Sequence, residues 1–290
     1  MPEQKSRGVV LVTGGTDGLG KAASVLLAER GYRVYAGGRS APKLAQIDGL
    51  AAEKKLPLAS LELDVCSDES VRAGVERVLA EAGAIDVLIN NAGIGYIAVV
   101  EELKLEDLRQ QYETNIFGVL RVTQTVLPSM RARKKGRIVM ISSVAGLVTP
   151  PTYGAYSSSK FALEALSNAL RLELHPFGIQ VVLIEPGYIV TNFQQTAKAL
   201  AEPYVAKAME GAYAKVYSGA WTGASSSRQK SKSTPEDFAQ VVLRATESGS
   251  PKTRYGVTPL AAVAKWGKRL LSDKMTDKLL RKKYGIPEPD

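Results

Sequence analysis

Tyr156 and Lys160 are the residues whose types and spacing best suit chemistry, and three serines separate them. The surrounding segment, GAYSSSKFALEALSNALRLEL, has the pattern of a helix, and a four-residue step places both side chains on one face about one turn apart. A phenol normally loses its proton near pH 10, and a neighbouring ammonium favours the phenolate and lowers that pKa. We therefore expect the pair to act as a general acid/base near neutral pH.

Ser143 is a second candidate, because it follows the apolar run RIVMIS. That run predicts a buried parallel strand. Ser143 is then expected at the carboxyl end of the strand, where ligands bind in open α/β sheets. Its hydroxyl group could hydrogen-bond a carbonyl oxygen there without competing for the proton.

A glycine-rich turn lies near the start of the chain, in GVVLVTGGTDGLGKAASVLLAERG. Glycines at 14, 18 and 20 allow a tight turn and a close approach to a pyrophosphate, and the next helix offers free N–H groups and a positive dipole end. The spacing is GxxxGxG and not the commoner GxGxxG. An ordinary turn is the alternative, but the strand before and the helix after favour a cofactor site.

Seven motifs together resemble the short-chain dehydrogenase/reductase family over roughly the first 250 residues. They are TGGTDGLG at 13–20, LDV at 63–65, NNAG at 90–93, NIFG at 115–118, ISS at 141–143, YSSSK at 156–160 and EPGYIVT at 185–191. The glycine spacing, together with YxxxK, is similar to the smaller oxidoreductase branch of the family and unlike the longer epimerase and dehydratase branch.

The resemblance implies a catalytic tetrad of Asn115, Ser143, Tyr156 and Lys160. Tyr156 would exchange a proton with the substrate oxygen, which Ser143 would polarise. Lys160 would lower the pKa of Tyr156 and hold the nicotinamide ribose. Asn115 would anchor a water molecule that relays protons through Lys160.

The resemblance also implies a set of residues around a nicotinamide cofactor that supplies the hydride. Asp64 and Val65 would contact its adenine side, and Asn91, Ala92 and Gly93 would line its cleft. The PG motif, Pro186 and Gly187, would hold its carboxamide together with Ile189 and Thr191. The full set is Gly14, Thr16, Asp17, Gly18, Leu19, Gly20, Arg39, Ser40, Asp64, Val65, Asn91, Ala92, Gly93, Tyr156, Lys160, Pro186, Gly187, Ile189 and Thr191.

The choice of cofactor depends on the end of the expected second strand, which carries Gly38, Arg39 and Ser40 and no carboxylate. A carboxylate there usually binds the ribose of NAD, whereas a basic residue pairs with the extra phosphate of NADP. Because Arg39 can form paired bonds to a phosphate, we expect NADP(H) rather than NAD(H). The acidic residue Asp17, in the glycine loop, argues against NADP(H). The alternative interpretation of Arg39 is a solvated surface arginine.

Composition excludes several other classes of function. The single cysteine, Cys66, excludes an intrachain disulfide framework, and the single histidine, His175, leaves no Ser-His-Asp arrangement and no metal site. The net charge of +9 would suit nucleic acid or a membrane surface, but no nucleic-acid-binding motif accompanies it. The polar start of the chain lacks a secretory core and no apolar run is long enough to span a bilayer, so we expect a cytoplasmic protein.

Alternating strand and helix patterns predict an α/β fold, a single-domain Rossmann-type doubly wound parallel sheet. The expected domain covers 1–258, with a helical substrate lid within 188–233, and a basic helical extension covers 259–290. Expected strands are 8–13, 32–37, 58–63, 85–89, 136–142, 178–184 and 253–257. Expected helices are 18–30, 41–54, 68–82, 102–130 with breaks, 153–174 and one that opens after Thr234 and runs to about Ser248.

The lid is expected to contain one or two helices, followed by a mobile loop in the segment TGASSSRQKSKST at 222–234. Its large residues could line an apolar substrate pocket or pack the lid against the body. They are Tyr188, Phe193, Tyr204, Met209, Tyr213, Tyr217 and Trp221. Few fixed charges accompany them, which favours a lipophilic substrate over a small anionic one.

The tail after Tyr255 combines apolar residues with a dense basic face. One interpretation is a helix pair that closes the substrate site or joins subunits. The other is a basic amphipathic helix lying on an anionic membrane surface. The apolar side would comprise Trp266, Leu270, Leu271, Met275, Leu279 and Leu280.

The leading hypothesis is an NADP(H)-dependent oxidoreductase that interconverts a carbonyl and an alcohol on a lipophilic substrate. Segments around 161–174 and 178–193 are similar to family members that act on steroids, retinoids or acyl-dihydroxyacetone phosphate. The alternatives are an NADP(H)-binding regulatory protein and a membrane-surface lipid reductase anchored by the tail. The resemblance also implies a homodimer or homotetramer built through the helices near 102–130 and 153–174.

Overall fold

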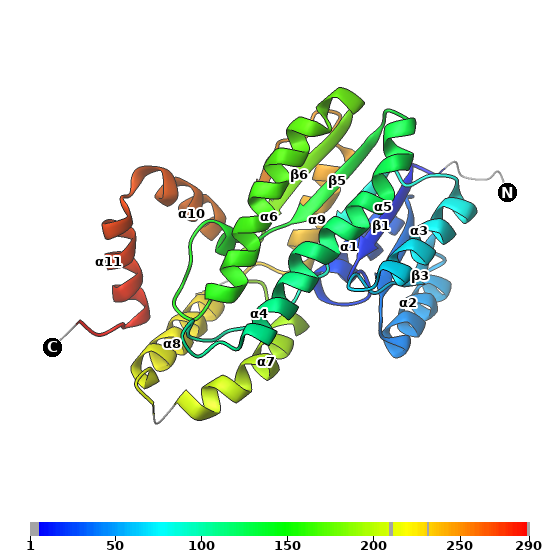
Figure 1. Ribbon diagram of the computed structural model, residues 1–290. Coiled ribbons are helices and arrows are strands. Elements are labelled where there is room, and N and C mark those ends of the chain that lie inside the picture. The colour runs from blue at the N-terminus through cyan, green and yellow to red at the C-terminus, as the bar shows by residue number, and fades with distance from the viewer. Residues whose placement is uncertain (1–5, 209–210, 231, 289–290) are drawn as a thin grey trace.

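The computed structural model describes residues 6–208, 211–230 and 232–288. Within these residues a single sheet of seven parallel strands has the order β3-β2-β1-β4-β5-β6-β7 (Figure 1). The strands are β1 Val9–Thr13, β2 Arg33–Gly38, β3 Leu58–Glu62, β4 Val87–Asn90, β5 Gly136–Ile141, β6 Ile179–Glu185 and β7 Arg254–Gly256. All seven expected strands form, with ends within two residues of the predicted positions.

Helices cover both faces of this sheet, as the alternating pattern predicts. Apolar side chains of α3, α5 and α6 form the core on one face, and those of α1, α2 and α9 form the core on the other. The helices of the body are α1 Gly18–Glu29, α2 Ala41–Lys54, α3 Asp68–Ala82, α4 Leu105–Tyr112, α5 Gly118–Ala132, α6 Gly154–Glu173 and α9 Pro235–Glu247. The doubly wound fold is therefore confirmed.

The register of the strands gathers several loops at one edge. Thr13 of β1 pairs with Asn90 of β4, which pairs with Met140 of β5, and Ile141 of β5 pairs with Ile184 of β6. Because these strands are parallel and in step, the segments that follow them leave the sheet at the same edge. The glycine loop, the NNAG segment, Ser143 and the EPGYIVT segment all lie at this edge, where ligands bind in open α/β sheets.

The expected breaks within 102–130 have a specific form. A π-helical segment at Glu113–Phe117 separates α4 from α5, and Asn115 lies at its centre. Such single-turn π segments inside helices frequently occur at functional sites. The helix predicted after Thr234 is also present, and a capping box between Thr234 and Asp237 fixes its start.

The lid contains two helices, α7 Asn192–Ala208 and α8 Ala214–Lys230. The prediction of a mobile loop over 222–234 is wrong for most of that segment, because α8 continues to Lys230. Two hydroxyl groups bond back to carbonyl oxygens of the preceding turn, Thr222 to Ser218 and Ser226 to Gly223, which is compatible with a helix. A composition rich in serine therefore did not break the helix here.

Two further helices follow β7, α10 Pro259–Leu270 and α11 Asp273–Tyr284. Together they form the C-terminal helix pair, which projects from the body on the side of α8 (Figure 1). Tyr284 packs against α8 where two glycines face it. A Cβ on Gly219 would lie 1.9 Å from the Tyr284 carbonyl oxygen, and one on Gly223 would lie 2.3 Å from the Tyr284 ring. This contact requires glycine at both positions.

Among the described residues, no helix combines the length and the apolar character needed to cross a membrane.

Candidate active site

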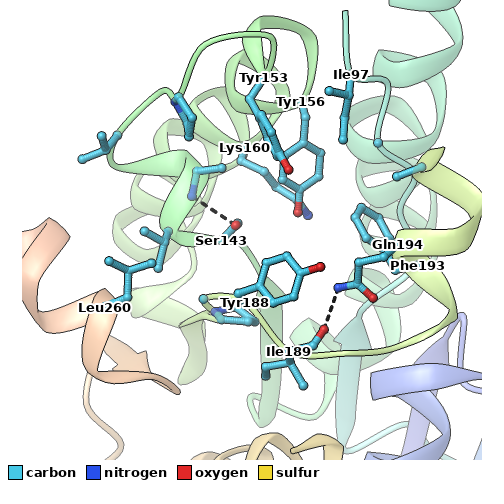
Figure 2. A pocket seen from close by; sticks show the side chains of 18 of the residues that line it. Ile97, Ser143, Tyr153, Tyr156, Lys160, Tyr188, Ile189, Phe193, Gln194 and Leu260 are labelled. Carbon is cyan, nitrogen blue, oxygen red and sulfur yellow. Dashed lines mark hydrogen bonds between the residues drawn. The ribbon is translucent and has the colours of Figure 1, made fainter. Parts of the chain in front are cut away.

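Tyr156 and Lys160 lie on successive turns of α6 and face one cavity (Figure 2). The Nζ atom of Lys160 is 5.7 Å from the centre of the Tyr156 ring. Ser143 follows β5 and caps the short helix Val144–Gly146, because its Oγ accepts a hydrogen bond from the Ala145 N–H at 3.1 Å. The three predicted residues are therefore brought together at the carboxyl end of the sheet.

Burial controls the ionisation of Tyr156. It raises the pKa of Tyr156 to about 12, while a hydrogen bond with the Ser143 hydroxyl acts in the opposite direction. In the present arrangement the raising effect of burial on the pKa of Tyr156 dominates, and the lowering effect of Lys160 stays a prediction. The Lys160 ammonium donates to the Ile141 carbonyl oxygen at 2.8 Å, and desolvation of the phenol dominates. Tyr156 therefore holds its proton at neutral pH.

Lys160 is itself buried, with 5% of its surface exposed. Burial lowers the pKa of Lys160 to about 8, and the charge of Glu164 acts to raise it. Glu164 lies one turn further along α6 and forms an ion pair with Arg254, which also bonds Glu185 at 2.6 Å. This cluster of two buried carboxylates and a half-buried arginine joins α6, β6 and β7, and its Glu164 lies one turn from Lys160.

Asn115 holds the backbone beside the site. Its Oδ1 accepts from the Ile94 N–H at 2.9 Å, and its Nδ2 donates to the Ile94 carbonyl and the Ser159 hydroxyl. The side chain is 1% exposed and does not line the cavity. The geometry assigns it a positioning contact with the segment after β4, and the water relay stays a prediction.

The glycine loop and the segment after β4 are tied together by Asn91. Its Nδ2 donates to the carbonyl oxygens of Thr13 and Gly14 at 3.0 Å, and its backbone N–H donates to the Thr13 hydroxyl. A Cβ on Gly20 would lie 2.1 Å from the Gly14 carbonyl oxygen. The glycine at position 20 is thus required by the packing of the loop itself.

Asp17 caps the helix that follows the glycine loop. Its Oδ1 accepts from the Gly18 N–H at 2.7 Å, while Lys43 on α2 and Asn192 on α7 donate to the same carboxylate. Burial alone would raise the pKa of Asp17, but the hydrogen bonds from Lys43, Asn192 and Gly18 lower it. Asp17, which argued against NADP(H) in the sequence, is therefore a helix cap whose charge Lys43 neutralises.

The residues expected at the adenine end lie further along the same edge, outside the cavity. Arg39 follows β2, and its guanidinium is 3.5 Å from the Asp64 carboxylate, with both side chains partly exposed. Ser40 precedes α2 and makes no capping hydrogen bond with its side chain. Thr16 packs against Gly38, while the Val65 carbonyl accepts a hydrogen bond from Arg121.

The PG motif forms the opposite wall. The Pro186 carbonyl accepts from the Val144 N–H, and a Cβ on Gly187 would lie 2.1 Å from the Thr258 hydroxyl. The backbone after Ile189 is fixed by Gln194, which donates to the Ile189 carbonyl at 2.6 Å and accepts from the Thr191 N–H. These contacts connect the end of β6 to the start of the lid.

These segments enclose a cavity of about 680 Å³. Its lining contains fourteen of the predicted site residues: Gly14, Asp17, Gly18, Leu19, Asn91, Ala92, Gly93, Ser143, Tyr156, Lys160, Pro186, Gly187, Ile189 and Thr191. Asn115 and six other predicted residues do not line the cavity, and these six are Thr16, Gly20, Arg39, Ser40, Asp64 and Val65. The structure thus brings the nicotinamide-side set together and leaves the adenine-side set beyond the cavity.

The two interpretations of the large lid residues each hold for different residues. Tyr188, Phe193, Tyr217 and Trp221 line the cavity. Tyr204 is buried against the body, where its hydroxyl bonds Asp107, and the Tyr213 hydroxyl bonds Glu101. Met209 lies outside the described residues.

Sequence reasoning missed several residues at this site. Tyr153, Ile97, Val148 and Leu260 line the cavity from three separate segments, since Val148 and Tyr153 share the loop before α6 (Figure 2 labels all but Val148). No local motif marks these positions. Lys43 could have been found, because it is a basic residue in the first turn of the helix that follows Arg39 and Ser40.

Replacement of Lys160 tests the burial of its charge. The pKa of Lys160 in the folded protein, about 8, is below its ordinary value of 10.5, so the buried charge costs stability below pH 8. This cost falls as the pH rises from 8 to 10.5. We expect Lys160→Met to raise the free energy of unfolding at pH 7 by on the order of 1 kcal/mol, and this advantage to disappear by about pH 10.

Urea unfolding followed by circular dichroism at pH 7 and pH 10 measures this effect. The exposed Lys252→Met variant is the matched control and should show no such dependence. An advantage of Lys160→Met that stays constant with pH would contradict the buried-charge explanation.

Comparison with known proteins places the whole arrangement in one family. Residues 8–201 match the family model described as short chain dehydrogenase. The 3-ketodihydrosphingosine reductase of Bacteroides thetaiotaomicron is 40% identical over 185 residues, covering 64% of this chain and 65% of that protein. The NADPH-dependent 3-dehydrocapnine reductase of Ornithobacterium rhinotracheale is 34% identical over 280 residues, covering 94% and 95%.

A solved structure agrees with these matches. The crystal structure of a short-chain dehydrogenase from Streptomyces avermitilis superposes with a TM-score of 0.77 at 29% identity, covering 98% of this chain and 100% of that one. The family model spans more than half of this chain. The chain therefore belongs to the short-chain dehydrogenase/reductase family of oxidoreductases.

Proposed function

We propose that this protein is an NADP(H)-dependent oxidoreductase that interconverts a carbonyl and an alcohol on a lipophilic, lipid-like substrate. The observation that carries the proposal is that one cavity joins the polar Tyr156–Ser143 end to walls of apolar side chains. Ile97, Val148 and Leu260 are among these apolar residues. A cavity of this kind can hold a hydrocarbon body while the polar end orients one oxygen atom.

The chemistry follows from the two hydroxyl groups. When bound, the nicotinamide cofactor supplies or accepts the hydride. Tyr156, protonated at neutral pH because its pKa is about 12, is suited to donate a proton to the oxygen of a carbonyl that is being reduced. Ser143 can donate a hydrogen bond to the same oxygen. In the reverse direction Tyr156 would act as the base, and a nearby Lys160 ammonium would favour the phenolate that this role needs.

The chain's residues fit a dinucleotide. The loop containing Gly14 and Gly18 lies at the start of α1 and lines the same cavity as Lys160, so backbone N–H groups and an ammonium are available to anionic and hydroxyl groups. Arg39, beyond this loop, has 66% of its side chain exposed and carries a fork of donors suited to a phosphate. Lys43, in the first turn of α2, adds a second cation, which pairs with Asp17 in the present arrangement. These residues favour NADP(H), and one of the relatives described above is NADPH-dependent by name.

The relatives also favour a lipid-like ketone. One of the relatives described above is a 3-ketodihydrosphingosine reductase by name, and another is a 3-dehydrocapnine reductase by name. The apolar walls contributed by α7, α8 and the C-terminal helix pair suit the hydrocarbon portion of such a molecule. The regulatory alternative is less favoured, because Asn115, Ser143, Tyr156 and Lys160 are all present.

A panel of ketones of increasing alkyl chain length tests the substrate class. With NADPH as the cofactor, kcat/KM should rise by up to about fourfold per methylene group until the cavity is filled, since each buried methylene contributes about 0.8 kcal/mol. Small charged keto acids should be poor substrates. Turnover that is independent of chain length would contradict a lipophilic substrate, and tight NADPH binding without any turnover would favour the regulatory alternative.

Tyr156→Phe tests the proposed acid. The substitution removes the proton donor and keeps the ring, so kcat should fall roughly 100- to 10,000-fold while NADPH affinity, measured by fluorescence titration, changes little. Tyr153→Phe is the matched control, because this tyrosine lines the same cavity beside Tyr156 and should retain most of the activity. Comparable turnover in Tyr156→Phe and the parent protein would assign the acid to another group.

Arg39→Ala tests the choice of cofactor. Loss of a charged, paired contact to a phosphate should weaken NADPH binding roughly 10- to 100-fold, whereas NADH binding should change little. Arg39→Lys keeps the charge without the planar fork and should fall between the two. Equal losses for both cofactors would mean that Arg39 does not contact the additional phosphate.

A further inference from the structure

The C-terminal helix pair exposes large apolar side chains to solvent. On α10, Trp266 is 56% exposed and Leu270 is 75% exposed, and on α11 Met275 is 53% exposed. None of the three lines the cavity. Single exposed apolar residues are ordinary, but a concentration of them on two consecutive helices marks an interaction surface.

This apolar surface continues into the wall of the cavity. Val263 is 66% exposed and also lines the cavity, and Leu279 on α11 is 55% exposed and does the same. The spacing of Val263, Trp266 and Leu270 places them on one side of α10. A molecule that covers the outer face of the pair would therefore contact the same two helices that form part of the cavity wall.

Basic residues flank the apolar side chains. Residues 259–288 contain eight lysines and arginines and three acidic residues. On α11, Lys274, Lys278 and Lys282 are exposed and lie outside the cavity lining. On α10, the Arg269 guanidinium lies 5.9 Å from the centre of the Trp266 ring.

We propose that the C-terminal helix pair docks on an anionic membrane surface. An apolar stripe flanked by lysine and arginine suits the interface of such a bilayer, where the apolar side chains enter the headgroup boundary and the cations pair with phosphate groups. A second copy of this chain is a poorer occupant, because pairing two such faces brings like charges together. Docking would deliver a lipid substrate from the bilayer to the cavity. Only this consequence rests on the proposed function, and the docking itself does not.

Vesicle co-sedimentation of the full-length protein tests the docking without any substrate. Vesicles of equal parts phosphatidylglycerol and phosphatidylcholine should bind it at least tenfold more strongly than vesicles of phosphatidylcholine alone. The variant Trp266→Gln/Leu270→Gln/Met275→Gln should reduce binding at least tenfold and retain turnover of short, water-soluble ketones. The variant Lys274→Gln/Lys278→Gln/Lys282→Gln should bind more weakly and lose most of its dependence on salt concentration.

Two controls distinguish the docking face from a general effect of surface substitution. Leu172, on α6, is 73% exposed, so Leu172→Gln removes an equally exposed leucine from another surface and should leave binding unchanged. Trp221→Phe leaves Trp266 as the only tryptophan of the chain. Anionic vesicles should then shift its fluorescence to shorter wavelength, and brominated lipids should quench it.

Three outcomes would overturn the proposal. They are an absence of binding to anionic vesicles, equal binding by the parent protein and the triple glutamine variant of the apolar face, or a Trp266 emission that vesicles do not change. If the protein does not bind vesicles and that same variant has a lower molar mass than the parent protein in light scattering, the face serves self-association. Vesicle binding is measured without turnover. The docking proposal can therefore fail while oxidoreductase activity is present, and the proposed activity can fail while the protein still binds vesicles.

Discussion

The parallel, in-step pairing of β1, β4, β5 and β6 is the constraint on which the rest of the molecule depends. The register Thr13 to Asn90 to Met140, and Ile141 to Ile184, sends the glycine loop, the segment after Asn90, Ser143 and the PG motif out at one edge. A shift of one residue in β5 would turn its buried side chains to the opposite face and displace Ser143. The apolar cores on both faces oppose such a shift.

Burial at that edge determines the chemistry of the two central groups. Desolvation disfavours both charged forms, which raises the pKa of Tyr156 to about 12 and lowers that of Lys160 to about 8. The arrangement therefore holds a proton on the phenol while its ammonium partner contacts the Ile141 carbonyl. The buried Glu164–Arg254–Glu185 cluster ties α6 to β6 and β7, so the same contacts that hold the catalytic helix on the sheet also act on the charge of Lys160.

The substrate end of the cavity depends on contacts between distant segments. Tyr284 packs on Gly219 and Gly223, and this contact sets α11 against α8. Asp17 receives hydrogen bonds from Lys43 and Asn192, which link the glycine loop to α2 and to the start of α7. Lid, tail and cofactor loop thus meet around one space, although they lie as much as 267 residues apart between Asp17 and Tyr284.

The sequence by itself determined the seven strands, the body helices and the motif residues, because periodicity, glycine spacing and helix caps are local properties of the chain. Only the tertiary structure decided the rest. The serine content of 222–234 suggested a loop, but most of that segment belongs to α8, the helix that packs against Tyr284. Tyr204 and Phe193 are both aromatic residues of the lid, yet Tyr204 is buried against the body and Phe193 lines the cavity. The pKa of Tyr156 followed from burial rather than from its spacing to Lys160, since desolvation depends on every group that surrounds a side chain.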